Sequence, residues 1–126
     1  MSSRIRVLPR WLATVIALTA LPALAGEKAW ELRLDGIAPA GGAVVLAVTT
    51  EDGAVQHVPV EIRAEFPEVR NSRVLAQALL RTLGKTWRVE RPEDDRILVR
   101  RLDGAPFTLG IVSNSATGLK LDTVAQ

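Results

Sequence analysis

The chain has 126 residues, of which 48% are hydrophobic and 24% charged, with no cysteine, one histidine and a formal net charge of +2. This length suits one modest domain and excludes large α/β barrels and multidomain enzymes. The lack of cysteine excludes disulfides, thiolate zinc sites, iron–sulfur clusters and cysteine nucleophiles. The apolar fraction and the charge balance are those of a folded chain, not of a disordered one.

Residues 1–25 have the pattern of a secretory signal peptide. Three arginines lie within the first ten residues, an apolar run of fifteen residues follows, and Ala23-Leu24-Ala25 supplies the small-x-small cleavage pattern. A membrane-spanning helix needs about 20 apolar residues, so this run is too short to be a retained anchor. We expect cleavage after Ala25. The mature chain, residues 26–126, would be one small domain in the bacterial periplasm or outside the cell, without a transmembrane span.

Loss of this leader changes the charge argument. Residues 26–126 keep 13 basic and 14 acidic side chains, a net charge of −1. Net charge therefore gives no support for nucleic-acid binding, and the few remaining aromatic residues form no cluster suited to base stacking. Gly41-Gly42 leads into a predicted strand and not into a helix, which excludes a phosphate-binding loop of the dinucleotide or P-loop type. We predict neither a nucleic-acid partner nor a cofactor.

Strand patterns dominate the first half of the mature chain. Residues 30–35 alternate apolar and charged side chains, which predicts a half-buried strand. Residues 43–63 predict a β-hairpin, because an apolar run and an alternating run flank the turn signal Glu51-Asp52-Gly53. After Gly84, shorter patterns predict three or four further strands at residues 87–90, 97–102, 107–111 and 119–124.

One amphipathic helix is predicted between residues 72 and 83. Asn71 or Ser72 would cap its start, and Gly84 suits the left-handed position after its end. Its apolar side chains fall within one arc at 100° per residue, namely Leu75, Ala76, Leu79, Leu80 and Leu83. The element order predicts an α+β fold: an antiparallel sheet of about five to seven strands with one amphipathic helix on one face.

Two predicted strands are apolar on both faces, although a single helix covers one face of a sheet. These are residues 43–48 and 97–99, and continuous apolar runs are typical of strands buried on both sides. Either the sheet curls into a sandwich or partial barrel that covers itself, or its second face meets another protein chain. The second alternative predicts a protein partner or a homo-oligomer, with Val45, Ala47, Ile97 and Val99 as the contact face.

The helix also carries a basic stripe formed by Arg70, Arg73 and Arg81. Guanidinium groups suit carboxylate or phosphate partners, so this stripe predicts an alternative role as a binding module for an anionic surface, glycan or protein. A solvated helix face is the simpler interpretation of the same charges.

Residues that could carry catalysis or hold a metal are scarce. His57 would be the base of a small hydrolase only if a nucleophile and an orienting group lay nearby, and the sequence contains no motif that supplies them. Glu93-Asp94-Asp95 lacks the ligand spacing of a calcium loop and predicts a solvated turn. We therefore predict no catalytic residues and no metal site. The favoured function is that of an exported, non-enzymatic protein that acts by protein–protein association.

Overall fold

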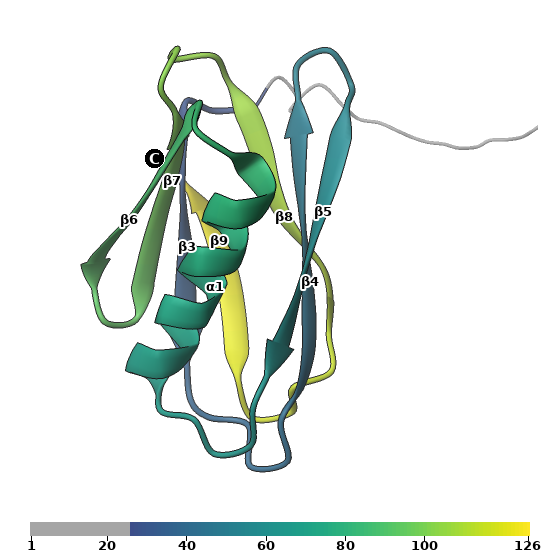
Figure 1. Cartoon of the computed structure of the whole chain (residues 1–126), viewed down its shortest axis with the longest axis vertical. Coiled ribbons are helices and arrows are strands. Elements are labelled where there is room, and N and C mark those ends of the chain that lie inside the picture. Colours follow the sequence, from purple (N-terminus) through teal and green to yellow (C-terminus); the bar gives the residue numbers. More distant parts are fainter. Residues whose placement is uncertain (1–25) are drawn as a thin grey trace, which may run out of the picture.

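A computed structural model describes residues 26–126, and the predicted signal peptide, residues 1–25, lies outside the described residues. Seven strands and one helix occur in the described part of the chain (Figure 1): β3 (Ala29–Asp35), β4 (Gly42–Thr50), β5 (Val55–Ile62), α1 (Glu68–Leu83), β6 (Trp87–Glu93), β7 (Arg96–Arg101), β8 (Phe107–Asn114) and β9 (Lys120–Ala125). All strand pairs are antiparallel. The predicted α+β class with antiparallel strands is confirmed.

The strands form two sheets, a four-stranded sheet in the order β6-β7-β3-β9 and a three-stranded sheet in the order β5-β4-β8. The predicted hairpin is the β4–β5 pair, in which Val44 lies opposite Val60. A β-bulge interrupts the β4–β8 register between Val45 and Leu46 and leaves Val112 without a partner. The edge strands β8 and β9 lie near each other but do not pair, so the sheets do not close into a barrel.

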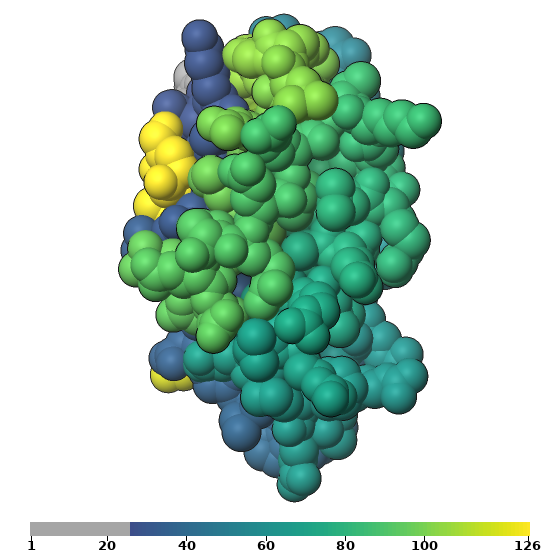
Figure 2. Space-filling model, turned by 60° about the vertical axis from the view of Figure 1, so that its left-hand side comes forward, coloured from purple at the N-terminus to yellow at the C-terminus, as the bar shows by residue number. Residues whose placement is uncertain are grey.

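One hydrophobic core joins both sheets and the helix. Its fully buried side chains include Leu32 of the four-stranded sheet, Leu46 of the three-stranded sheet and Leu79 of the helix. The helix packs against β5 and β6, the outermost strands of the two sheets on that side (Figure 1). Figure 2 shows it beside the β6–β7 hairpin on the molecular surface. The inner face of each sheet is thus covered from within the chain, while helix α1 covers neither outer face.

The helix begins four residues before the predicted start, which corrects the predicted cap. Pro67 occupies the N-cap position without a side-chain cap bond, as suits a residue whose fixed φ and missing N–H are tolerated at helix starts. Asn71 and Ser72 lie inside the helix and are buried. The Asn71 amide donates to the carbonyl of Phe66, and the Ser72 hydroxyl donates to that of Val69.

The predicted helix end and most of the predicted buried face are confirmed. Gly84 has φ of 89°, a left-handed value that glycine adopts without strain, and its N–H donates to the carbonyl of Leu80. Leu80 itself was assigned to the buried face, and that assignment is wrong, because its side chain is 44% exposed. Trp87 is buried near the helix and meets Phe107 edge to face at 4.7 Å between ring centroids.

Candidate binding surfaces

The predicted contact face does not exist as a single surface. Ile97 and Val99 of β7 have no exposed surface, and both belong to the core. Val45 and Ala47 of β4 lie on the outer side of the other sheet and are half-buried. Strand runs that are apolar on both sides leave the direction of the side chains undetermined. The assignment of Ile97 and Val99 to a partner surface is therefore corrected.

Val45 and Ala47 belong to a surface that carries very little charge, which we name the sparsely charged face. It is the outer face of the three-stranded sheet and is formed by Ala43, Val45, Ala47 and Thr49 of β4, Val55, His57, Pro59 and Glu61 of β5, and Thr108, Gly110, Val112 and Ser113 of β8. Glu61 brings its one formal charge. Val55 and Val112 are among the most exposed large hydrophobic side chains described, at 49% and 56%.

The outer face of the four-stranded sheet is composed differently, and we name it the ion-paired face. It carries Arg88 and Glu90 of β6, Arg96, Leu98 and Arg100 of β7, Glu31, Arg33 and Asp35 of β3, and Lys120, Asp122 and Val124 of β9. Glu90 lies 3.4 Å from the Arg88 guanidinium and 3.7 Å from that of Arg100. Glu31 is 6% exposed and accepts from Arg33 Nε at 2.6 Å. Each arginine of this face thus has an acidic partner within the same sheet.

The arginines predicted as an anion site differ from the other arginines in their pairing. Six arginines have an acidic partner within 4.0 Å, and all six lie on strands of the four-stranded sheet: Arg33, Arg88, Arg91, Arg96, Arg100 and Arg101. The remaining arginines of residues 26–126 form no such pair: Arg63, Arg70, Arg73 and Arg81. Three of these form the predicted stripe on helix α1, and Arg63 follows strand β5.

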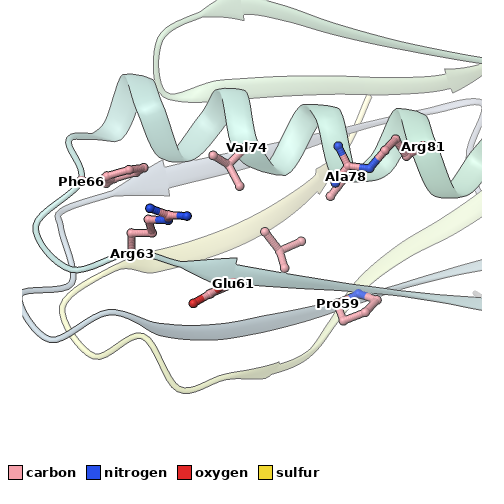
Figure 3. A pocket seen from close by; sticks show the side chains of 8 residues that line it. Pro59, Glu61, Arg63, Phe66, Val74, Ala78 and Arg81 are labelled. Carbon is pink, nitrogen blue, oxygen red and sulfur yellow. The ribbon is translucent and has the colours of Figure 1, made fainter.

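Two of the unpaired arginines line a hollow between the edge strand β5 and helix α1. The hollow has a volume of about 280 Å³, and it is lined by Pro59, Val60, Glu61, Arg63, Phe66, Val74, Ala78 and Arg81. Figure 3 shows Arg63 extending toward the helix, and Val74, Ala78 and Arg81 spaced along the helix above strand β5. Arg70 contacts the other side of this region, with its guanidinium 5.3 Å from the centroid of the Phe66 ring.

The predicted stripe is therefore divided. Arg81 lines the hollow, Arg70 lies over Phe66 at its end, and Arg73 is exposed but absent from the lining. Sequence reasoning missed Arg63 and Phe66, because both lie in the irregular segment between β5 and α1, where periodicity gives no signal. The preceding alternation through Ile62 could only place Arg63 at the end of a strand.

A second hollow, of about 380 Å³, lies at one end of the ion-paired face. It is lined by Lys28, Ala29, Arg88, Arg100, Arg101, Leu102 and Gly104. Its three arginines already have carboxylate partners, since Glu90 contacts two of them and Asp103 lies 2.8 Å from the third. This hollow is basic in composition but has less free positive charge than the first.

His57 and the acidic turn after β6 lie apart from both hollows. His57 is exposed on the sparsely charged face opposite Ala47, and no hydrogen bond involving its ring is found in the described residues. Asp94 and Glu93 face Arg91 and Arg96 at 3.9 Å. No group of three or more His, Asp or Glu side chains that could hold a metal ion occurs within residues 26–126.

No family model, curated protein or solved structure matches the chain. Within residues 26–126, no helix has both the length and the apolar character needed to cross a membrane.

Proposed function

We propose that the chain is an exported, non-enzymatic protein that acts by protein–protein association, and that the sparsely charged face packs against the same face of a second copy. The observation that carries this proposal is the contrast in composition between the two outer sheet faces. Exposed apolar groups gathered on one face are typical of surfaces that bind other proteins. Export rests on the leader pattern of residues 1–25.

A second copy is the favoured occupant because this face does not repel itself. Two copies related by a two-fold axis present the same patch to each other, so a patch rich in charge of one sign would repel its own copy. The sparsely charged face has Glu61 alone near its margin. Its central strand offers the small side chains Val45 and Ala47, which suit the close approach of two stacked sheets.

The mass of the purified protein in solution tests this proposal. Size-exclusion chromatography with light scattering should give a dimer at concentrations of about 10–100 μM, a range that covers modest interfaces. Val112→Glu should shift the protein to a monomer, because it places like charges in the interface. A protein that is monomeric throughout this range would contradict the proposal.

A matched control variant tests whether the position of the added charge matters, or only the charge itself. Leu102 is 58% exposed, close to the 56% of Val112, but it lies in the loop after β7 and outside the sparsely charged face. Leu102→Glu should leave the dimer intact. If both variants weakened the dimer equally, the sparsely charged face would not be the interface.

Export is tested by a different measurement. Mass spectrometry of the exported protein should show a chain that begins at Gly26.

A second candidate function is supported by the unpaired arginines. An anion-binding module through the helix was the alternative from sequence, and Arg70, Arg73 and Arg81 all lack an acidic partner within residues 26–126. Unpaired guanidinium groups bind carboxylates or phosphates strongly because the planar group donates two parallel hydrogen bonds. Binding of an anion there should weaken steeply with added salt.

A further inference from the structure

The hollow between β5 and α1 combines three features that are found together nowhere else among the described surfaces. Its floor is apolar, its arginines have no internal partner, and it lies beside an edge strand. The Gln56 side chain donates to the carbonyl of Thr82 and so links β5 to the last turn of the helix. Phe66 lies at the other end, near the start of the helix. The hollow is therefore a short groove bounded at both ends.

The apolar and charged groups of this groove are separated in space. Val60, Val74 and Ala78 provide aliphatic surface between strand and helix. Arg63 approaches from the strand end and Arg81 from the helix (Figure 3), so two guanidinium groups flank the aliphatic floor. Glu61 borders the same hollow from the outer side of strand β5, and no ion pair joins it to either arginine.

The size of the groove limits what it can hold. Its volume of about 280 Å³ lies just below the range of ligand pockets, about 300–1,000 Å³. An aliphatic side chain with carboxylates on either side matches it in size and charge. The edge of β5 contains Pro59, which has no backbone N–H, so continuous strand pairing along this edge is disfavoured. Recognition must then rely on side chains.

We propose that this groove binds an acidic, extended segment of a partner protein. One leucine-sized side chain of the segment fills the hollow over Val74 and Ala78, and flanking carboxylates bind Arg63 and Arg81. A flat anionic membrane would contact protruding arginines such as Arg73 at least as well as those set into a groove. The concave placement favours the peptide. The groove shares Pro59 and Glu61 with the margin of the sparsely charged face, but the arginines that carry this proposal lie outside that face, and neither proposal depends on the other.

Three fluorescent peptides of about eight residues provide the probe, a length that spans a short groove. The first has a leucine between acidic residues, the second has amides in place of the acids, and the third has serine in place of the leucine. Fluorescence polarisation with the purified protein should show binding of the first peptide and at least about tenfold weaker binding of the other two, since each lacks one of the matched features.

Arginine variants locate the site. The double variant Arg63→Ala/Arg81→Ala should weaken binding of the acidic peptide at least about tenfold, because both charge-assisted contacts are lost. Arg81→Ala alone should also weaken binding, and Arg73→Ala is its matched control, because it too removes one positive charge from helix α1 but lies outside the hollow; Arg73→Ala should change the dissociation constant by less than about twofold. Circular dichroism should show all three variants folded.

A variant that keeps all charges tests the apolar part of the site. Ala78→Leu should fill the hollow and exclude the peptide's leucine, weakening the acidic peptide while leaving Arg63 and Arg81 in place. Equal binding of the acidic and amide peptides would overturn the proposal. The proposal would also be overturned if Arg73→Ala weakened peptide binding as much as the double variant does. A third contrary outcome would be that phosphatidylglycerol vesicles bind more tightly than the acidic peptide and that their binding depends on Arg73 as much as on Arg63 and Arg81. Val112→Glu should leave peptide binding unchanged, which separates this result from that of the dimer.

Discussion

The outer faces of the two sheets differ in composition, one being rich in paired charges and the other almost without charge. On the ion-paired face, the arginines are paired with acids of the same sheet, as where Glu90 contacts Arg88 of its own strand and Arg100 of the neighbouring strand. On the sparsely charged face, the central strand β4 instead presents Val45 and Ala47, and Pro59 lies opposite Val45 on the edge strand β5. Both faces lie outside the same core, so burial within the chain does not explain the difference. This difference is the basis of our proposal that the sparsely charged face contacts a second copy.

The arginines extend the comparison to the helix. Arginines on the four-stranded sheet are neutralised by acids of the same sheet, whereas those of α1 and of the segment before it have no such partner within residues 26–126. Exposed ion pairs contribute little to stability, about 0–1 kcal/mol each. The arrangement of the ion pairs nevertheless shows where arginines are free to contact a partner. The arginines of the ion-paired face are already paired, whereas the surface around helix α1 has both unpaired arginines and apolar area.

The largest expected effect contrasts the two sides of strand β7. Ile97 is fully buried while its neighbour Leu98 points to the ion-paired face. Ile97→Ala should lower the free energy of unfolding by about 3 kcal/mol, because it removes buried methyl groups and leaves a cavity. Leu98→Ala should cost less than about 1 kcal/mol. Urea denaturation of both variants measures the difference. Similar losses would contradict the assignment of Ile97 to the core and of Leu98 to the outer face.

A smaller effect is expected within the ion-paired face. Arg33→Ala should lower the free energy of unfolding by about 2 kcal/mol, because it leaves the Glu31 carboxylate buried without its guanidinium partner. Arg96→Ala removes an exposed pair at 3.9 Å and should cost less than about 0.5 kcal/mol. Chemical denaturation near pH 7 compares the two. Equal losses would mean that the buried position of Glu31 has no energetic consequence.

Periodicity was sufficient to predict most of the elements but not how they pack. The strand at residues 30–35 and the hairpin followed from alternation, and Gly84 marked the helix end. The early helix start was missed, because Asn71 and Ser72 look like caps; in the structure the Asn71 amide donates back to Phe66, just before the helix, and the Ser72 hydroxyl donates to Val69 in the first turn. The division into two sheets depends on long-range pairing such as β3 with β7 and β9, which no local pattern encodes.

The candidate site was predictable in part for the same reason. The helical spacing of Arg70, Arg73 and Arg81 is visible in the sequence. That Arg81 shares a hollow with Arg63, whereas Arg73 does not, depends on how β5 and α1 pack together. The choice between the two sides of an apolar strand likewise depends on which side meets the other sheet, and this placed Ile97 and Val99 in the core.

Added salt should separate the two proposed surfaces. Raising sodium chloride from about 50 to about 500 mM screens exposed charges strongly. The dimer formed by the sparsely charged face should change its dissociation constant by less than about twofold, because that face brings one formal charge per copy. Light scattering at both salt concentrations measures it. A dimer that dissociates at high salt would instead implicate the arginines in self-association.

The smallest expected effect concerns the turn between β4 and β5, at the end of the three-stranded sheet. The charge of Asp52 lies in this turn. The Thr50 hydroxyl and, less strongly, the Ala54 backbone N–H donate to Asp52 and hold the pKa of its carboxyl below the ordinary value of 3.8. A carboxyl with a lowered folded pKa stabilises the fold above its unfolded pKa, and this contribution disappears as the pH falls through the folded value.

Asp52→Ala should therefore melt at a slightly lower temperature than the parent protein at pH 7, and the difference should vanish as the pH falls below about 3.8. Thermal unfolding followed by circular dichroism across this range measures it, with an NMR titration of the Asp52 carboxyl as the direct check. Glu51→Ala is the matched control in the same turn, because no hydrogen bond from the Glu51 side chain occurs in the described turn. If Glu51→Ala gave the same pH-dependent difference, the effect would come from the net charge of the turn and not from the Asp52 hydrogen bonds.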